Sequence, residues 1–142
     1  VGDLMLAFSD AAIAAQNAVV AAESLGRGSC YIGDIMENCA RQRALLHLPE
    51  YVFPAVMLVF GWPTPQQRER PKPQRCPMAH IVHQNTYRSM DGAELRAMLA
   101  HNCGTRPFEE WCAAFCERKY NSDFSREMTR SVAEYLRQFQ RG

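Results

Sequence analysis

The first part of the chain carries an unusually apolar segment. Between residues 11 and 22, small apolar side chains follow one another with hardly a polar face, which predicts a helix buried on most sides. Ser9 or Asp10 is placed to cap this helix at its start, and Gly26 supplies the left-handed residue that ends it after Glu23. The uncharged stretch is shorter than the roughly 18–20 apolar residues of a membrane span. We therefore expect a central or interface helix and no contact with a membrane.

Two short apolar runs that follow are typical of strands. Residues 28–34, with a glycine near each end, predict a short strand, and Asp34 is placed to cap a helix from about Ile35 to Leu46. The six residues Ala55–Phe60 are apolar without alternation, which predicts a strand buried on both faces.

The rest of the chain divides into a proline-rich connector and a helical end. Residues 61–77 hold five of the eight prolines, which argues against helix or inner strand, and a brief extended piece is expected at residues 81–82. Helices are expected from a capping pair at Asp91, from Pro107 and from about Asp123. The last of them carries one apolar stripe, formed by Phe124, Met128, Val132, Tyr135, Leu136 and Phe139. This stripe docks either on its own domain or, as an arm, on a second subunit.

Composition and charge place this pattern in an ordinary globular domain. The 142 residues are 47% apolar and 22% charged with a formal net charge of +1, which excludes disordered, collagen-like and coiled-coil chains. The charge is uneven, because residues 1–60 carry three Arg against six acids whereas residues 61–88 carry five basic groups against one acid. An anionic ligand is therefore to be sought at the connector. The six cysteines show no repeated CxxC pairing, which indicates a reduced, cytoplasmic protein.

Three groups of residues could carry chemistry, although the motifs of serine hydrolases, P-loop NTPases, zinc metalloproteases and dinucleotide-binding folds are absent. The glycines around residues 28–34 let a planar ligand approach the backbone, or simply punctuate a turn. Lys72 and Arg75, on either side of Pro73, can grip a phosphate together, or belong to a solvated loop. The third group offers four soft metal ligands: His101, Cys103, Cys112 and Cys116. Their spacing favours buried cysteines over zinc, so no metal is expected.

Four blocks of the sequence, taken in order, carry a family resemblance. They read AAIAAQNAVVAAESLGRGSCYIGDI, LPEYVFPAVMLVFGWP, RPKPQRCP and IVHQNTY. The chain resembles the second half of the FMN-dependent nitroreductases, also called NAD(P)H:flavin oxidoreductases, most strongly over residues 9–88. The later stretch FCERKYNSDFSREMTRSVAEYL is similar to the C-terminal helices of nitroreductase-like proteins of anaerobic bacteria.

This resemblance implies an α+β fold, a sandwich of a mainly antiparallel sheet with helices, assembled as a homodimer with FMN at the interface. The helix Ala11–Leu25 would be the long central helix that packs against its mate. Residues 1–88 would form the C-terminal half of the flavin-binding core. Residues 89–142 would form a helical extension packed on the partner subunit.

The resemblance also implies a site and a reaction. The residues implied for cofactor binding are Tyr31, Ile32, Gly33 and Asp34 beside the flavin ring and Lys72 and Arg75 near its phosphate. Arg106 falls where some members hold the phosphate of the nicotinamide nucleotide. The flavin would carry hydride from NAD(P)H to a small-molecule acceptor, a nitroaromatic, a quinone or a second flavin, and no side-chain acid or base is needed. No nucleic acid is expected as a partner.

The early helices and strands of the family, and its first phosphate-binding block, have no counterpart in these 142 residues. We therefore expect the chain to be the C-terminal portion of such an enzyme and to bind FMN poorly without the N-terminal segment or a partner chain. The alternative function is a non-catalytic dimerisation or ligand-binding module that retains only part of the flavin site. A zinc-stabilised helical domain is a third hypothesis.

Overall fold

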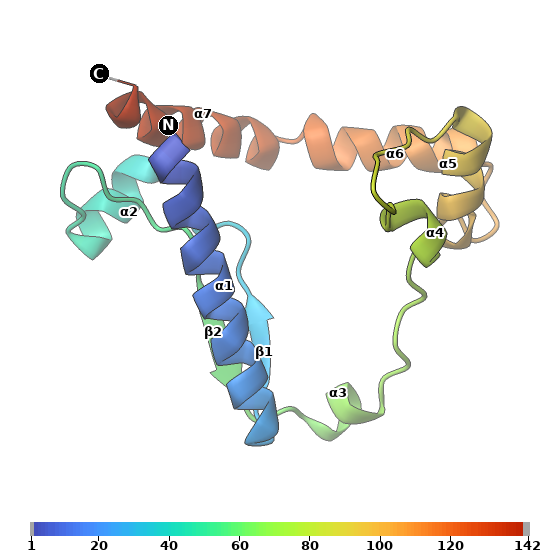
Figure 1. Cartoon of the computed structure of the whole chain (residues 1–142), viewed down its shortest axis with the longest axis horizontal. Helices are drawn as coiled ribbons and strands as arrows, with labels where there is room; N and C mark the ends of the chain where they lie inside the picture. The colour runs from blue at the N-terminus through green and yellow to red at the C-terminus, as the bar shows by residue number, and fades with distance from the viewer. Residues whose placement is uncertain (1, 141–142) are drawn as a thin grey trace. The chain divides into compact units, whose positions relative to one another are not determined.

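A long helix, a two-stranded antiparallel ribbon and a series of shorter helices make up residues 2–140, the part of the chain that the structure, a computed structural model, describes (Figure 1). The elements follow in the order α1 (Gly2–Ser24), β1 (Gly28–Tyr31), α2 (Cys39–Leu46), β2 (Leu58–Gly61), α3 (Pro65–Glu69), α4 (Met78–Ile81), α5 (Gly92–Leu99), the 3-10 turn η1 (Ala100–Asn102), α6 (Phe108–Tyr120) and α7 (Asp123–Phe139). They divide into two compact units. Unit 1 contains residues 2–69 and 122–140, and unit 2 contains residues 70–121.

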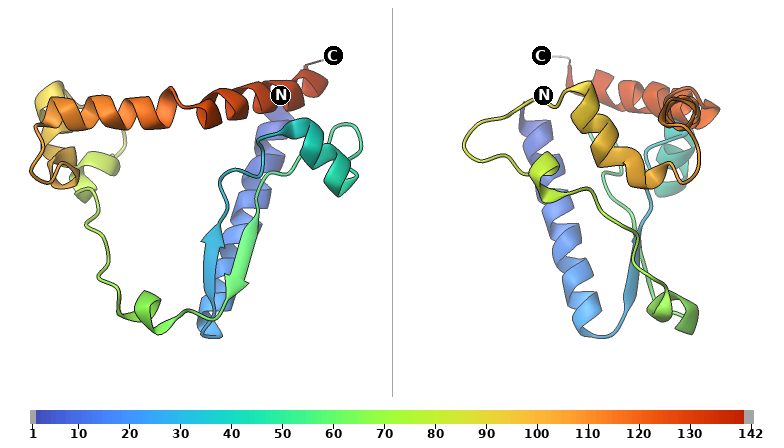
Figure 2. Two further views of the ribbon diagram at one scale, coloured as in Figure 1. Left: turned by 180° about the vertical axis from the view of Figure 1, so that it is seen from behind. Right: turned by 90° about the vertical axis from the view of Figure 1, so that its right-hand side faces the viewer.

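In unit 1, α1 lies alongside the ribbon of β1 and β2 (Figures 1 and 2). The two strands pair so that Gly28 faces Gly61 at one end and Tyr31 faces Leu58 at the other. Helix α1 ends where the sequence predicts, because Gly26 takes a left-handed conformation with a φ of 71°. The N–H of Arg27 then donates to the carbonyl oxygen of Ala22 at 2.9 Å and closes the last turn.

The start and the environment of α1 differ from expectation. The helix begins at Gly2, so Ser9 and Asp10 lie inside it and cap nothing. None of the residues Gly2–Ser24 is buried, because within residues 2–140 only the ribbon and a few neighbouring side chains lie next to the helix. The expectation of a helix buried on most sides is therefore wrong for the chain by itself.

The same helix has the dimensions of a membrane span. Its 23 residues contain an 18-residue window with a mean hydropathy of 1.5, enough by length and composition to cross a bilayer. The uncharged run inside the helix is short, as expected, and the whole helix reaches the length and composition of a span because its few charged residues do not lower the mean hydropathy enough. The same composition suits a helix that is covered by another protein subunit.

The strands are shorter and more exposed than the sequence predicts. Strand β2 begins at Leu58 and is largely exposed, and β1 is its one strand partner within the described residues. The expectation of burial on both faces is therefore wrong. Asp34 lies in a turn, where its carbonyl oxygen accepts a hydrogen bond from the N–H of Glu37 at 3.1 Å. Helix α2 begins four residues later than expected, at Cys39, after Asn38 in the left-handed region.

The core of unit 1 lies between α2 and α7. Tyr135 of α7 is 1% exposed and Ser131 is completely buried, and both pack near Cys39 of α2. The ring of Phe53 lies 5.5 Å from that of Tyr135 and 6.1 Å from that of Phe139. The part of the α7 stripe that holds Tyr135 and Phe139 thus packs within its own unit, whereas Phe124 of the same stripe is 49% exposed.

Unit 2 holds its own small core and confirms two predicted helix starts. Asp91 and Glu94 form a reciprocal capping box at the start of α5, and α6 begins directly after Pro107. The core is made by Met98, Cys103 and Trp111.

The connector departs from expectation at two places. It contains the short helix α3, which is compatible with its prolines because Pro65 occupies the first helical position, where no N–H is needed. Ile81 ends the helical turn α4, so the expected extended piece is reduced to Val82, with φ −114° and ψ 120°.

Candidate functional site

Four of the predicted site residues follow one another at the end of β1. Tyr31 is the last residue of the strand, and its hydroxyl donates a hydrogen bond to Oε1 of Gln16 on α1 at 3.1 Å. The N–H of Ile32 donates to the carbonyl oxygen of Met57 at 3.0 Å. These two bonds fix the segment against α1 and the chain before β2.

The backbone beyond Ile32 is open. Gly33 and Asp34 are exposed, and a Cβ built on Gly33 would meet no heavy atom within 4 Å. The N–H groups of Gly33 and Asp34 have no hydrogen-bond partner within residues 2–140. The turn therefore offers a flat approach and two free donors to the polar edge of a planar ligand.

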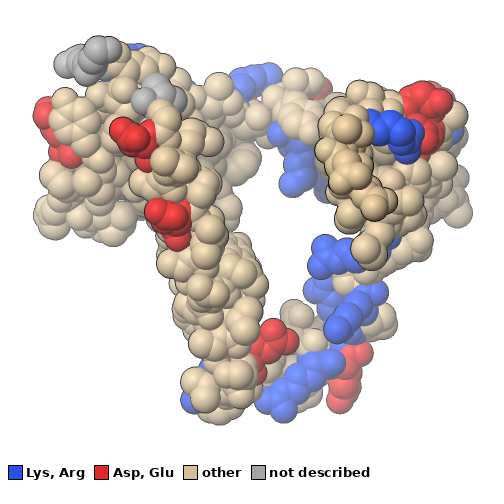
Figure 3. Space-filling view, in the orientation of Figure 1, with Lys and Arg blue, Asp and Glu red and all other residues tan. Residues whose placement is uncertain are grey.

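Lys72 and Arg75, the predicted phosphate pair, lie in the extended connector that follows α3. Both side chains are exposed, and neither forms an ion pair within the described part of the chain. Figure 3 shows Lys and Arg side chains gathered around and after α3. The pair belongs to unit 2, whereas Tyr31–Asp34 belongs to unit 1. Their joint role in binding one cofactor stays a prediction.

Arg106, the residue predicted to contact the nicotinamide nucleotide, lies just before α6 in unit 2. It lines a cavity of about 190 Å³ together with Trp111, Phe115 and Arg118. Two guanidinium groups beside two aromatic rings can hold an anion next to a planar group.

The candidate metal ligands do not converge. No three His, Cys, Asp or Glu side chains between residues 2 and 140 come together as a metal site. Cys103 is buried and its thiol points at the carbonyl oxygen of Leu99 at 3.8 Å. Burial, together with a hydrogen bond to Cys112, raises the pKa of the Cys116 thiol. These thiols therefore behave as small core side chains.

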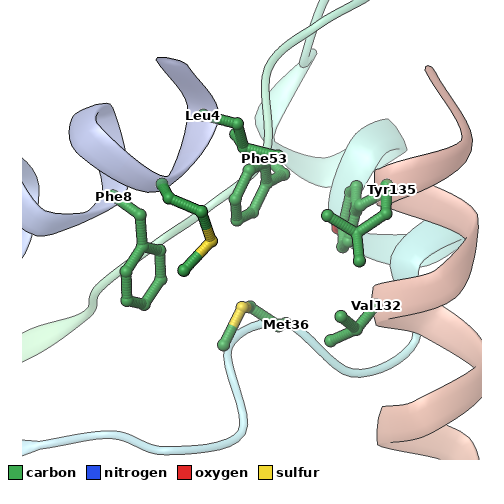
Figure 4. Close-up of a pocket in the computed structure, with 8 residues that line it drawn as sticks. Leu4, Phe8, Met36, Phe53, Val132 and Tyr135 are labelled. Carbon is green, nitrogen blue, oxygen red and sulfur yellow. The ribbon is translucent and has the colours of Figure 1, made fainter. Parts of the chain in front are cut away.

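One cavity was not predicted from the sequence. It has a volume of about 240 Å³, and its lining is wholly apolar. Figure 4 shows Leu4 and Phe8 of α1, Met36 and Phe53 of the loops, and Val132 and Tyr135 of α7 around it. The four contributing segments are too far apart in sequence for a spacing argument to join them. With no polar lining, this cavity suits an apolar side chain or an apolar part of a ligand and offers nothing to a phosphate.

Comparison with known proteins gives this arrangement a context. Residues 2–62 match the family model described as Nitroreductase family. The chain is 35% identical over 99 residues to an NADPH-dependent oxidoreductase of Staphylococcus epidermidis, covering 70% of this chain and 39% of that protein. It is 42% identical over 88 residues to an oxygen-insensitive NADPH nitroreductase of Salmonella typhimurium, covering 62% of this chain and 35% of that protein. It is 34% identical over 126 residues to an FMN reductase (NAD(P)H) of Bacillus subtilis, covering 89% of this chain and 46% of that protein.

Solved structures agree with these sequence relatives. Nitroreductase A from Vibrio parahaemolyticus superposes with a TM-score of 0.66 at 27% identity, covering 95% of this chain and 55% of that one. NfrA1 from B. megaterium superposes with a TM-score of 0.60 at 34% identity, covering 96% of this chain and 51% of that one. The α+β class is thereby confirmed. The chain spans about half the length of the solved structures and less than half of the curated relatives named above. These comparisons support a nitroreductase-family protein, with the family match in residues 2–62, which carry the long helix, the ribbon and the open turn that follows β1.

Proposed function

We propose that the chain forms part of an FMN-dependent oxidoreductase that transfers hydride from NAD(P)H to a nitroaromatic, quinone or flavin acceptor. The observation that carries this proposal is the open turn at Tyr31–Asp34, which lies inside the segment that matches the family. The relatives support the reaction type, because their names describe NADPH-dependent oxidoreductases, a nitroreductase and an FMN reductase.

The open turn fits the flavin ring in its chemistry. Gly33 presents bare backbone with free space where a side chain would stand. The free N–H groups of Gly33 and Asp34 can donate to the polar edge of the ring, where negative charge gathers when the flavin is reduced. The bond between Tyr31 and Gln16 holds the strand end against α1, so the turn is positioned before the ligand binds.

The basic pair in the connector supplies the phosphate contacts in this proposal. Lys72 offers a compact positive charge and Arg75 a forked donor, and the intervening Pro73 reduces the entropy lost when the loop orders around a phosphate. Both side chains are exposed and therefore available to a ligand.

The remaining roles follow from the chemistry of the cofactor. FMN, when bound, supplies the hydride transfer between NAD(P)H and the acceptor. Arg106 and Arg118 at the cavity before α6 would hold the phosphate of the nicotinamide nucleotide. The protein side chains then need only to bind and orient, and none of them acts as an acid or base.

The proposal includes residues beyond those of this chain. Because the curated relatives named above are more than twice as long as the segments matched here, we propose that an N-terminal half completes the phosphate site. Residues 1–88 would contribute the C-terminal half of the flavin core, and residues 89–142 a helical extension packed on a partner subunit. We further propose a homodimer in the cytoplasm, where the six cysteines would remain reduced thiols.

Titration with FMN tests the proposal. Flavin fluorescence is followed as the purified chain is added, first for the chain as it stands and then for the double variant Lys72→Ala/Arg75→Ala. We expect weak but saturable binding, and a further loss of about tenfold, or ~1.4 kcal/mol, in the double variant because both phosphate contacts are gone. The control is Arg126→Ala/Arg137→Ala, which removes the same charge from exposed positions on α7 and should leave the affinity within about twofold.

The outcomes separate the two functions. Saturable binding that depends on Lys72 and Arg75, together with NADPH oxidation when FMN and a nitroarene are added, supports the oxidoreductase. Unsaturable binding at millimolar FMN, in a chain that retains its helical circular dichroism, would favour the non-catalytic module instead.

A further inference from the structure

A second candidate site lies at the other end of the ribbon from the open turn. Here α1 ends, β1 begins and β2 ends, and the three meet around a groove of about 540 Å³. Three residue steps of β1, about 10 Å, separate it from Tyr31, because a strand rises about 3.3 Å per residue. All the residues that line the groove belong to unit 1, and none of them is assigned to the flavin.

An arginine stacked on a tryptophan forms the floor of this groove. The guanidinium carbon of Arg27 lies 3.2 Å from the centre of the Trp62 ring. Trp62 is nevertheless 68% exposed, so the second face and the edges of the indole are open to solvent. A cation held on one face of an indole leaves the other face ready to stack on a planar group.

The groove also carries unpaired positive charge. Arg27 and Arg68 both line it, and neither forms an ion pair with an acid anywhere in the described chain. Glu23 is the one acidic residue of the lining, which leaves a net lining charge of +1. Ser29 adds an exposed hydroxyl at the start of β1. Two guanidinium groups can bind one phosphate with forked, charge-assisted hydrogen bonds.

The backbone that carries these side chains is hydrogen-bonded without a ligand. Arg27 follows the left-handed Gly26, and its N–H is bonded to the last turn of α1. Arg68 sits in α3, where its N–H donates to the carbonyl oxygen of Thr64 at 3.1 Å. A site on rigid elements loses less entropy when its ligand binds.

We propose that this groove binds a small planar ligand that carries a phosphate, of the nucleoside-phosphate class. The base stacks on the open face of Trp62, and the phosphate lies between Arg27 and Arg68. Glu23 and Ser29 are placed to bond the hydroxyl or amino groups of such a ligand. A cavity of this volume is within the ordinary range for small-molecule sites. The proposal does not depend on the flavin site, because it shares no residue with it.

Isothermal titration calorimetry with the 142-residue chain tests this site, using AMP, adenosine and inorganic phosphate as probes. We expect AMP to bind saturably and each of the other two to bind at least tenfold more weakly, because each lacks one half of the interaction. Arg27→Gln and Trp62→Ala should each weaken AMP binding about tenfold or more. Arg41→Gln, at an exposed arginine of α2, is the matched control and should change nothing.

Two further measurements keep the test specific. Lys72→Ala/Arg75→Ala should leave AMP binding unchanged, so a failure of the flavin proposal does not imitate a failure here. AMP should quench the emission of the exposed Trp62. If Arg27→Gln unfolds the chain, Arg68→Gln on the exposed helix α3 replaces it. The proposal is overturned if phosphate alone binds as tightly as AMP, or if the two arginine variants bind like the control.

Discussion

Glu127 of α7 makes a hydrogen bond to the start of α2. Its Oε1 accepts hydrogen bonds from the N–H of Asn38 at 3.0 Å and from the hydroxyl of Ser131 at 2.8 Å, and Arg130 donates to both of its oxygens at 2.7 Å. The bonds from Arg130, followed by that from Ser131, lower the pKa of Glu127 from 4.5 to about 2. The ionised carboxylate thus also caps the start of α2, where Asn38 makes no side-chain cap of its own.

The depressed pKa gives a defined pH dependence of stability. Because the folded chain binds the Glu127 proton more weakly than the unfolded chain, its contribution is complete above about pH 4.5 and is lost as the pH falls toward 2. We expect Glu127→Gln to lower the free energy of unfolding at pH 7, with a difference from the parent that shrinks between these two values. Urea unfolding at pH 7, 4 and 3 measures it. The control Glu134→Gln removes a carboxylate that pairs with Arg137 on the open side of the same helix, and a pH-dependent loss of the same size in that variant would contradict the assignment.

At the same junction, the buried hydroxyl of Tyr135 lowers the stability of the fold. Its side chain is 1% exposed, yet its hydroxyl has no hydrogen-bond partner within residues 2–140, and burial raises its pKa. A buried hydroxyl without a partner costs about 1–3 kcal/mol. We therefore expect Tyr135→Phe to stabilise the chain by about 1 kcal/mol, while retaining the ring that packs on Phe53 and under Arg43.

Thermal unfolding followed by circular dichroism measures this gain. Tyr51→Phe, at a tyrosine that is mostly exposed, should leave the melting temperature unchanged. A lower melting temperature for Tyr135→Phe than for Tyr51→Phe would mean that the hydroxyl does have a partner in solution.

At the scale of the elements, two aspartates that resemble helix caps in sequence have opposite positions in the structure. Asp91 accepts a hydrogen bond from the N–H of Glu94 at 2.8 Å and begins α5, whereas Asp10 lies in the middle of α1. Asp91→Ala should cost about 1 kcal/mol because the cap is lost. Asp10→Ala should be neutral or slightly stabilising, since Ala has the higher helix propensity. Thermal unfolding followed by circular dichroism compares the stability of the two variants. An equal loss of stability in both would contradict the assignment of Asp91 as a helix cap and Asp10 as an interior helix residue.

The same contrast explains which elements can be predicted from the sequence. Caps and stops such as Asp91 and Gly26 act within a few residues, and both are where the sequence places them. Helix α2 starts late because Glu127 and Ser131, some 90 residues further along the chain, bind its first N–H groups, and no local pattern contains that information. The expected burial of Ala55–Phe60 rested on its lack of alternation, which predicts layers packed on both faces, whereas β2 is largely exposed in the part of the chain described.

Candidate sites divide in the same way. The turn at Tyr31–Asp34 could be predicted because it is one continuous segment between a strand and a helix. The groove of Arg27, Trp62 and Arg68 joins segments about 35 residues apart and depends on strand register, so its residues stand out only when the ribbon is built. Lys72 and Arg75 could be predicted because the connector has an excess of basic residues. The FMN titration of Lys72→Ala/Arg75→Ala tests whether they bind the same ligand as the turn.

For the whole molecule, α1 raises the question of what covers it. Leu6, Ile13 and Val20 are 66%, 61% and 57% exposed, and their spacing of seven residues puts them on one stripe of the helix. Such a stripe is self-complementary, because the same three side chains of a second copy can pack against it about a two-fold axis. We therefore expect the protein to form a homodimer through α1.

Sedimentation equilibrium with Ile13→Glu tests this dimer. Removing one buried isoleucine from each of two symmetric copies loses about 3 kcal/mol, which raises the dissociation constant roughly a hundredfold. The control Leu45→Glu places the same charge at an exposed leucine of α2 and should leave the association constant unchanged. The dimer is contradicted if the parent chain stays monomeric at all concentrations and binds lipid vesicles, and if Ile13→Glu loses that binding. This result would show that α1 packs against a bilayer, for which the length and mean hydropathy of the helix are sufficient.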